Sequence, residues 1–179
     1  RVYWIDTLKD EKKPIEKVKA GKTRLFAAGP MHYTILSRRY ILPFLCHMMY
    51  QRIHNTCAVG INPMSPEWQS LYNHLSRCGT NTVIAGDYSN WDGTTPIQAQ
   101  RYFFELICDW YTLHWDQVVK NKRNFSLGGK ELMRSEFIEL IRKIGIESYI
   151  HNHITTIGDE SVVYTVRNGI PSGCPTTAP

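Results

Sequence analysis

The stretch VIAGDYSNWDGTTP, residues 83–96, places two aspartates in different local settings. Asp87 follows a run of small and apolar residues, which predicts a strand over residues 81–87. Asp92 comes five residues later, in a Gly-Thr-Thr-Pro turn whose proline is typical of the first position of a helix. The sequence therefore predicts one carboxylate at the end of a strand and a second in the turn that follows it.

Three explanations of these aspartates differ in their chemistry. A calcium-binding loop starting at Asp87 is excluded, because its third ligand, at position 5 of the loop, would be Trp91 and its ligand at position 12 would be Gln98. A structural role is the second explanation, in which Asp87 caps a turn and Asp92 caps a helix or pairs with a lysine. The third is a metal site, in which a carboxylate and a neighbouring carbonyl hold Mg²⁺ against a substrate phosphate.

The composition is that of a globular protein, with 42% hydrophobic and 21% charged residues among 179. No apolar run approaches the roughly 18 residues that a membrane span needs. The five cysteines are scattered and none form a C-x-x-C pair, so a disulfide framework and a zinc knuckle are not indicated, and we expect reduced thiols. The opening RVYWIDTLKD and the closing GIPSGCPTTAP lead us to expect a piece of a longer chain.

Positive charge is concentrated in residues 9–24, KDEKKPIEKVKAGKTR. Seven of these sixteen residues are Lys or Arg and three are acids, which leaves +4 of the chain's net +5 in this segment. The AGKT sequence does not complete a P-loop, because Glu16 stands where the first glycine is required. The segment is either a solvated charged hairpin or a surface that neutralises phosphate oxygens.

The remaining sequence predicts a mixed α+β chain, because helices and strands alternate without βαβ regularity. Its elements are two extended pieces around VYWID and TRLFAA, helices over 34–54 (kinked at Pro43), 66–79 (capped by Ser65), 96–114 and 135–145, and a hairpin turning at residues 158–160. The face of the helix 96–114 expected to be buried is Ile97, Tyr102 or Phe103, Leu106, Trp110 and Leu113.

Two further features have ordinary and functional explanations. His151 and His153 alternate on a predicted strand, and without a third ligand nearby they are expected to be a solvent-facing pair. The segment RNGIPSGCPTT has glycines on both sides of Pro171-Ser172. It is either a surface turn or a loop whose backbone approaches a ligand closely.

Three stretches together resemble motifs of the RNA-dependent RNA polymerases of picornavirus-like positive-strand RNA viruses. KDEKKPIEKVKAGKTRLF resembles their basic fingers motif, AGDYSNWDGT the first palm motif, and GIPSGCPTT the start of the second palm motif. AAGPMHYTILSRRYILPF and VGINPMSPEW are similar to the insect and marine picorna-like branch. The resemblance covers essentially the whole chain, and the order and spacing of the motifs make it specific.

The resemblance implies a right-hand polymerase fold of the α+β class, with part of the fingers and palm present and the thumb absent. Residues 1–80 would be a fingers portion with the basic triphosphate-binding motif, and 81–115 the first palm strand and helix. Residues 116–168 would be an insertion between fingers and palm that includes the hairpin. Residues 169–179 would begin the loop of the second palm motif.

The resemblance also implies site residues, each at a position that matches a family motif. Asp87 and the Tyr88 carbonyl would bind Mg²⁺, which Mn²⁺ can replace, and Asp92 would sense the ribose 2′-hydroxyl. The residues implied to contact the nucleotide or the RNA are Lys9, Lys13, Lys17, Lys22 and Arg24 on the triphosphate, Ser172 and Thr177 beside Asp92, and Gly173 on the RNA. Asp87 would be the catalytic residue.

The implied reaction is template-directed, two-metal transfer of a ribonucleotide, in which a primer 3′-hydroxyl attacks the α-phosphate and pyrophosphate leaves. Its partners would be an RNA template-primer, ribonucleoside triphosphates and other viral replication proteins, in the cytoplasm of the host cell. The sequence contains no Gly-Asp-Asp, which supplies the family's other metal-binding acids. We therefore expect the 179 residues alone to be inactive.

Two alternatives remain open from the sequence. A reverse transcriptase-like palm would be expected to carry a bulky side chain against the 2′-hydroxyl, where this chain has Asp92. A non-catalytic RNA-binding domain would use residues 9–24 as a surface that follows the phosphate backbone.

Overall fold

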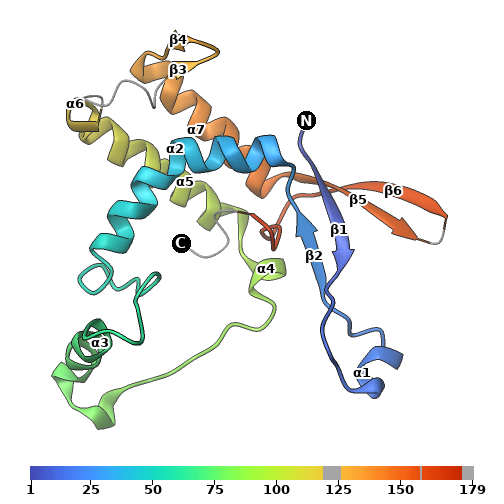
Figure 1. Cartoon of the computed structure of the whole chain (residues 1–179), viewed down its shortest axis with the longest axis horizontal. Coiled ribbons are helices and arrows are strands. Elements are labelled where there is room, and N and C mark those ends of the chain that lie inside the picture. Colours follow the sequence, from blue (N-terminus) through green and yellow to red (C-terminus); the bar gives the residue numbers. More distant parts are fainter. Residues whose placement is uncertain (119–125, 158, 175–179) are drawn as a thin grey trace.

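The computed structural model describes residues 1–118, 126–157 and 159–174. Thr177 and residue 158 of the predicted hairpin turn lie outside these ranges. The described chain combines a four-stranded sheet with a group of packed helices, which confirms the expected α+β class (Figure 1).

The sheet joins the two ends of the described chain. Its strands are β1 (Tyr3–Leu8), β2 (Leu25–Ala28), β5 (His151–Ile157) and β6 (Glu160–Val166), in the order β2-β1-β5-β6. β1 pairs antiparallel with β2 and parallel with β5, and β5 pairs antiparallel with β6. The two predicted extended pieces and the predicted hairpin are therefore confirmed as strands of one sheet.

The helices lie mostly between β2 and β5 in the sequence. They are α1 (Ile15–Lys19), α2 (Met31–Tyr50), α3 (Glu67–Leu75), α4 (Trp91–Thr94), α5 (Ile97–Leu113), α6 (Trp115–Val118) and α7 (Arg134–Tyr149). Short 3-10 turns cover Ser76–Cys78 and Thr80–Thr82, and the two-residue strands β3 (Ser126–Leu127) and β4 (Lys130–Glu131) form a small separate sheet. Pro43 lies inside α2 without splitting it, and the helix changes direction along its length (Figure 1).

The core is formed where α2, α5 and α7 meet. Tyr40, Tyr111 and Phe137 are fully buried, and the ring of Phe137 packs edge-on against both tyrosines at 5.5 and 4.8 Å between centroids. The Tyr111 hydroxyl donates a hydrogen bond of 2.7 Å to the carbonyl of Tyr40. This contact joins α5 to α2 through a buried polar group that is fully satisfied.

The predicted strand over residues 81–87 is wrong. After Thr80–Thr82 the chain has no regular structure as far as Tyr88, and Ile84 is 97% exposed. A strand requires a neighbour to receive its backbone hydrogen bonds, and within the described residues no strand lies alongside this stretch. Figure 1 shows it crossing open space between α3 and α4.

The predicted buried face of α5 is only partly right. Phe103 and Trp110 are partly buried, whereas Tyr102, Leu106 and Leu113 are exposed. The fully buried residues of this helix are Gln100, Phe104, Ile107, Cys108 and Tyr111. Apolar residues surround α5 on several sides, so its buried face is decided by packing against α7 rather than by periodicity.

Gly145 does not end its helix as the sequence predicts, and α7 continues to Tyr149. A Cβ at residue 145 would lie 2.7 Å from Cγ of Phe104. The glycine therefore permits the close approach of α7 to α5. The residues next to Gly145 in the sequence give no sign of this role, because the contact is with another helix.

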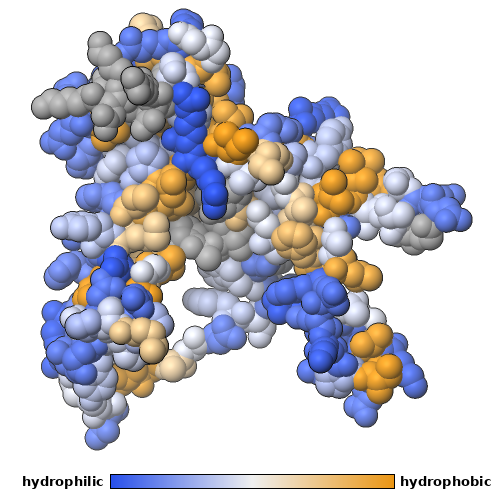
Figure 2. All heavy atoms as spheres, in the orientation of Figure 1, coloured by the Kyte–Doolittle hydropathy of each residue, from blue (hydrophilic) through white to orange (hydrophobic). Residues whose placement is uncertain are grey.

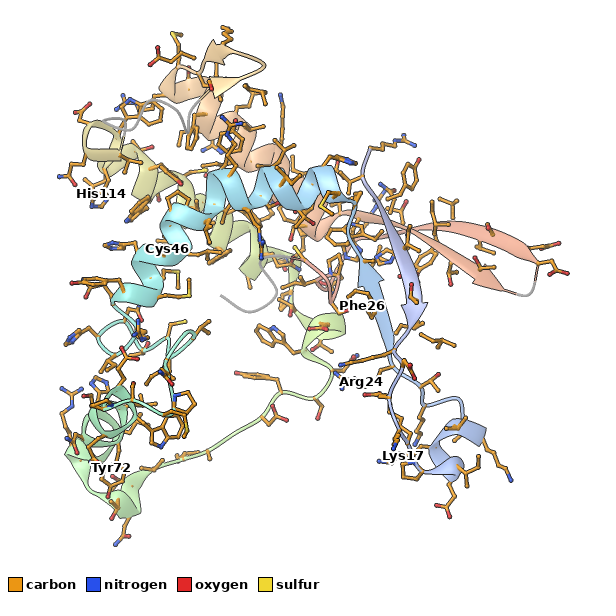
Figure 3. The ribbon with its side chains drawn as sticks, viewed as in Figure 1. Lys17, Arg24, Phe26, Cys46, Tyr72 and His114 are labelled. Atoms are coloured by element: carbon orange, nitrogen blue, oxygen red, sulfur yellow. The ribbon has the colours of Figure 1, made fainter. Side chains whose placement is uncertain are left out.

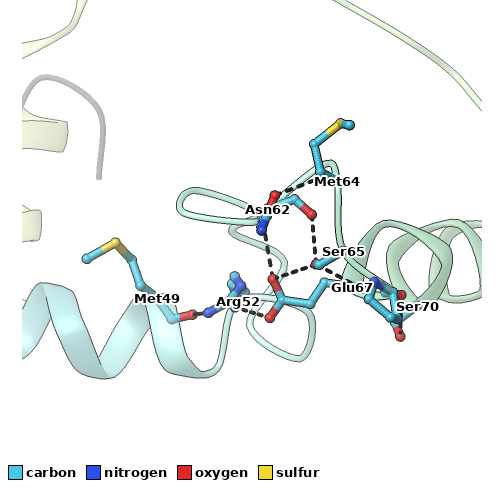
Figure 4. A network of polar contacts seen from close by, with 8 residues as sticks. Met49, Arg52, Asn62, Met64, Ser65, Glu67 and Ser70 are labelled. Carbon is cyan, nitrogen blue, oxygen red and sulfur yellow. Dashed lines mark hydrogen bonds and ion pairs between the residues drawn. The ribbon is translucent and has the colours of Figure 1, made fainter.

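The connection from α2 to α3 is held by a polar network (Figure 4). Arg52 pairs with Glu67, whose other oxygen accepts a hydrogen bond of 3.2 Å from the backbone of Asn62. Ser65 accepts a 3.3 Å hydrogen bond from the Glu67 backbone, but the N-cap of α3 is Pro66, one residue after the predicted cap. In the described part of the chain, no helix combines the length and the apolar character that a bilayer crossing requires.

Candidate active site

A cavity of about 830 Å³ opens where the sheet, the turn before α4 and the loop after β6 meet. Residues from distant parts of the sequence line it, among them Lys9, Arg24, Tyr88, Asp92, His151 and Ser172. Its volume is in the range of pockets that hold small organic ligands, roughly 300–1,000 Å³. The space-filling view shows the molecule deeply hollowed between the lobe that carries α3 and the lobe that carries α1 (Figure 2).

The basic wall of the cavity is built by β1 and β2. The backbone of Lys9 donates a hydrogen bond of 2.9 Å to the carbonyl of Arg24, which extends the β1–β2 pairing by one step. Glu11 pairs with Lys13 at 2.9 Å and with Arg24 at 3.6 Å. The hydrogen bond from Lys13 lowers the pKa of the Glu11 carboxyl, so this acid stays charged and offsets part of the positive field.

The five predicted triphosphate contacts separate into two groups. Lys9 and Arg24 line the cavity, whereas Lys13, Lys17 and Lys22 do not. Lys13 donates to the Lys22 carbonyl at 3.1 Å, so it braces the α1 segment. Figure 3 shows Lys17 on that segment, below Arg24 and outside the sheet.

The acidic side of the cavity is a turn made possible by Asn90, whose φ is +55°. The Asn90 carbonyl accepts hydrogen bonds of 3.0 Å from both Gly93 and Thr94, which starts the single turn of α4. Asp92 is in the first turn of α4 and lines the cavity. Its carboxylate has no hydrogen-bond or ion-pair partner among the described residues, so it is available as an acceptor.

Asp87 directly precedes Tyr88, a residue of the cavity wall. It is exposed and does not line the cavity, although its neighbour Tyr88 does. Its carboxylate, like that of Asp92, has no partner in the part of the chain that the structure describes. A free carboxylate next to the cavity is compatible with an ion that keeps most of its water and contacts a substrate phosphate.

The described residues do not form a complete metal centre. They include no group of three or more His, Cys, Asp or Glu side chains that could hold an ion. Asp87 and the Tyr88 carbonyl supply two oxygens, whereas Mg²⁺ takes about six. The donor set therefore fits one shared contact with a hydrated ion, and further ligands would have to come from substrate or from other residues.

The loop after β6 closes the cavity against β2. The hydroxyl of Ser172 accepts a hydrogen bond of 3.1 Å from the backbone of Ala27 and keeps its own proton free to donate. A Cβ at Gly173 would lie 2.1 Å from the Ala27 carbonyl oxygen, so only glycine fits there. This close packing explains the glycine at residue 173 by structure alone. The predicted contact of Gly173 with RNA stays a prediction.

The sequence-based interpretation missed a polar cluster that lines the cavity and is built around two buried histidines. His151 and His153 are 4% and 6% exposed, so the prediction of a solvent-facing pair is wrong. His153 Nδ1 lies 2.6 Å from a carboxylate oxygen of Asp6, and its Nε2 lies 2.5 Å from His151 Nδ1. The Tyr164 hydroxyl donates to the other Asp6 oxygen at 2.5 Å.

Burial controls the protonation of this cluster. Burial, and then the neighbouring His153, lower the pKa of His151 to about 4, so this imidazole is neutral at pH 7. Burial and the hydrogen bond to Asp6 raise the pKa of Tyr164 to about 12. The parallel pairing of β1 with β5 brings Asp6 beside His153, although the two residues lie near opposite ends of the sequence. The alternation of the two histidines in the sequence indicates that they share one face of the strand, but it does not indicate whether that face is buried.

The arrangement places two cations on one wall of the cavity and the unpaired carboxylate of Asp92 on the other. Lys9 and Arg24 can neutralise phosphate oxygens, and Asp92 with the Ser172 hydroxyl can exchange hydrogen bonds with a sugar hydroxyl. A cavity with both features suits a ligand that carries phosphates at one end and hydroxyls at the other.

Comparison with known proteins gives a consistent result. The model of the family described as viral RNA-dependent RNA polymerase matches residues 1–178. The chain is 40% identical over 176 residues to the replicase polyprotein of cricket paralysis virus and 35% identical over 178 residues to that of acute bee paralysis virus. These matches cover 98% and 99% of this chain but only 9% and 8% of the two relatives.

A solved structure also matches. The Sicinivirus 3Dpol RNA-dependent RNA polymerase has a TM-score of 0.67 and 24% sequence identity with this chain. The match covers 96% of this chain and 31% of that polymerase. The fold of this chain is therefore that of one part of a larger right-hand polymerase.

Proposed function

Because this chain belongs to the viral RNA-dependent RNA polymerase family, we propose that it forms part of an enzyme that copies RNA from ribonucleoside triphosphates. The family membership confirms the resemblance predicted from the three motifs. The chain spans less than a tenth of the two replicase polyproteins described above, so the activity proposed is that of the complete polymerase.

One observation carries the proposal: a single cavity joins Lys9 and Arg24 to Asp92 and Ser172. The sequence separates these residues widely, and the family motifs assign them to the two ends of one nucleotide. A solvated charged hairpin, the ordinary explanation of residues 9–24, gives no reason for Lys9 and Arg24 to share a cavity with the turn of Asp92.

In the proposed function the basic wall holds the triphosphate. Lys9 and Arg24 neutralise oxygens of the incoming nucleotide, and Arg24 can bind two of them through its planar guanidinium. This charge compensation is needed most as the primer 3′-hydroxyl attacks the α-phosphate and negative charge accumulates on the leaving pyrophosphate.

The turn at Asp92 is proposed to distinguish ribose from deoxyribose. Its carboxylate accepts from the 2′-hydroxyl, and Ser172 contributes a second hydrogen bond to the same region. A deoxynucleotide would leave the desolvated carboxylate unsatisfied, at a cost of roughly 1–3 kcal/mol. This preference for ribose is what separates the proposal from a reverse transcriptase-like palm.

Asp87 and the Tyr88 carbonyl would hold Mg²⁺, or Mn²⁺ in its place, together with acids from the rest of the polymerase. When bound, such an ion supplies positive charge to the reacting phosphate and lowers the pKa of the attacking hydroxyl. The contribution of this chain is a free carboxylate placed directly before a residue of the cavity wall.

The proposed partners follow from the reaction. They are an RNA template-primer, the four ribonucleoside triphosphates and, in the infected cell, other viral replication proteins. The place of action proposed is the cytoplasm of the host cell, where positive-strand RNA viruses replicate.

The test is Asp87→Asn in the complete polymerase. The substitution removes the negative charge of the proposed metal-binding side chain with almost no change of its shape. Nucleotide incorporation should therefore fall by at least about a hundredfold while RNA affinity is retained. Primer extension measures the first quantity and filter binding the second. Asp109→Asn, a matched change on the exposed side of α5, should leave both unchanged.

Unaltered synthesis by the Asp87→Asn polymerase would contradict the proposal. It would favour the non-catalytic alternative, in which this part of the chain only binds RNA through residues 9–24.

A further inference from the structure

The turn that presents Asp92 is tied to the loop after β6 by two backbone hydrogen bonds. The Ile170 N–H donates to the Asp92 carbonyl at 2.7 Å, and the Gly169 N–H donates to the Thr95 carbonyl at 3.1 Å. The turn and the loop are therefore joined directly, although they are far apart in the sequence. Figure 1 shows the loop after β6 passing beside α4 and the start of α5.

Gly169 is fitted tightly against this turn. Its φ is +74°, and a Cβ at this position would lie 2.4 Å from the Asp92 carbonyl oxygen. The positive φ and the missing side chain are both required for the contact. The position of the Asp92 backbone thus depends on the position of Gly169.

Gln100 fixes Gly169 from the other side. This side chain is 5% exposed, and its amide nitrogen donates to the Gly169 carbonyl at 2.7 Å and to the Thr95 carbonyl at 3.4 Å. The two carbonyls belong to the loop and to the turn respectively. One buried amide on α5 therefore joins both partners of the backbone pairing that carries Asp92.

We propose that Gln100 is a positioning residue that sets the reach of Asp92 toward the sugar of the incoming nucleotide. Gln100 does not line the cavity, so it acts through Gly169 and the backbone of the turn. The inference rests on the proposed role of Asp92 in sensing the 2′-hydroxyl. It assigns a role in sugar selection to Gln100, which lies on the packed helix α5 and outside the three motifs.

The physical reason lies in the geometry of a short acceptor. A carboxylate on a single methylene reaches the 2′-hydroxyl only if its backbone is placed correctly, because hydrogen bonds weaken steeply with distance and angle. Without the amide of Gln100, the buried carbonyl of Gly169 loses its partner and the loop is free to shift. Asp92 then shifts with it, through the 2.7 Å bond from Ile170.

The experiment compares Gln100→Met with Gln98→Met in the complete polymerase. Both changes replace the same amide on the same helix, but Gln98 is exposed. We expect Gln100→Met to lower the ratio of kcat/KM for a ribonucleotide over its deoxy analogue by about threefold to tenfold, the range of one neutral hydrogen bond. Gln98→Met should leave the ratio unchanged.

The ratio compares two substrates on the same preparation, so a smaller folded fraction cancels from it. If Gln100→Met yields no active protein, Gly169→Ala tests the same link, because its new Cβ would displace the Asp92 carbonyl. The expected result is again a lower ratio. An unchanged ratio in whichever of the two variants retains activity overturns the inference.

A double-mutant cycle separates this inference from the proposed function. If Gln100 acts through Asp92, Gln100→Met should lower the ratio no further in an Asp92→Asn polymerase, whereas independent effects would multiply. Full multiplication overturns the inference and leaves the role of Asp92 intact. An Asp92→Asn polymerase with normal sugar selection would instead contradict the proposed role of Asp92, and the inference with it.

Discussion

The basic wall of the cavity and the stretch that leads to Asp87 are held in very different ways. The basic wall belongs to a four-stranded sheet, and Lys9 and Arg24 are placed by backbone pairing. The stretch that carries Asp87 has no regular structure, and Ile84 before it is almost fully exposed. Within the described residues, the basic wall is therefore supported by pairing within the sheet, whereas Asp87, the proposed metal ligand, is a free carboxylate outside the cavity lining.

The two aspartates also differ in how many contacts within this chain hold them in place. Asp92 is fixed by hydrogen bonds to the loop after β6, all of them within this chain. Asp87 has no comparable support among the described residues. We therefore expect the proposed sugar contact of Asp92 to depend on contacts within this chain, and the proposed metal contact of Asp87 to require the complete polymerase.

The largest expected effect is the complete absence of synthesis by the 179 residues alone. One carboxylate and one carbonyl cannot hold two metal ions, and the sequence contains no Gly-Asp-Asp to supply the others. Incubating the purified chain with primer-template, Mg²⁺ and labelled nucleotides should give no extended product. Circular dichroism establishes that the sample is folded, and template-dependent extension by it would show that the metal side is complete after all.

A smaller effect is expected from the basic wall, and it should differ between its two groups of cations. Arg24→Ala in the complete polymerase should raise the nucleotide KM or lower kcat by about tenfold to a hundredfold, because a charge-assisted contact to phosphate is lost. Lys17→Ala should change both by less than about twofold, since Lys17 does not line the cavity. Steady-state kinetics at fixed ionic strength measure both variants.

Equal effects of the two changes would mean that α1 folds toward the nucleotide in the working enzyme. Normal kinetics for Arg24→Ala would assign the whole segment to a solvated surface.

The last expected effect is on the free energy of unfolding rather than on activity, and it concerns the histidines that line the cavity. Because the fold lowers the pKa of His151 to about 4, the unfolded chain, with an ordinary value near 6.5, takes up the proton first. The stabilisation is complete above pH 6.5 and is lost as the pH falls from 6.5 toward 4, by at most about 3 kcal/mol. Asp6, His153 and Tyr164 are the other titratable members of the cluster that contains His151.

Urea unfolding of the complete polymerase at several pH values measures this dependence. His151→Asn should flatten the curve between pH 6.5 and 4, whereas His54→Asn, a change at an exposed histidine, should leave its slope as it was. A curve with the same slope after His151→Asn would show that this imidazole does not titrate as its burial requires.

The sequence predicted well the elements that are defined by local signals. The helix predicted from Pro96 begins one residue later, at Ile97, with Pro96 as its N-cap, and the hairpin predicted to turn at residues 158–160 is formed by β5 and β6, because caps and turns depend on nearby residues. It also identified the three motifs that meet at the cavity. What it could not show is which of the basic residues would reach the cavity.

The errors have a common physical origin in contacts across the chain. The stretch 81–87 has the composition of a strand, but pairing requires a neighbour that the described residues do not supply. The buried position of His153 depends on Asp6, which belongs to the opposite end of the chain. Gln100 was not singled out either, because its partner Gly169 lies on a loop far along the sequence.

The parallel pairing of β1 with β5 has a consequence for how this chain is made. During synthesis β1 and β2 leave the ribosome before β5, and they can pair at once because they are close neighbours in the sequence. β5, which pairs with the other edge of β1, emerges only after the helices α1 to α7 have been synthesised. Until then that edge of β1 stays uncovered, which exposes the nascent polymerase to misassociation, so slow translation should favour aggregation and early chaperone binding should prevent it.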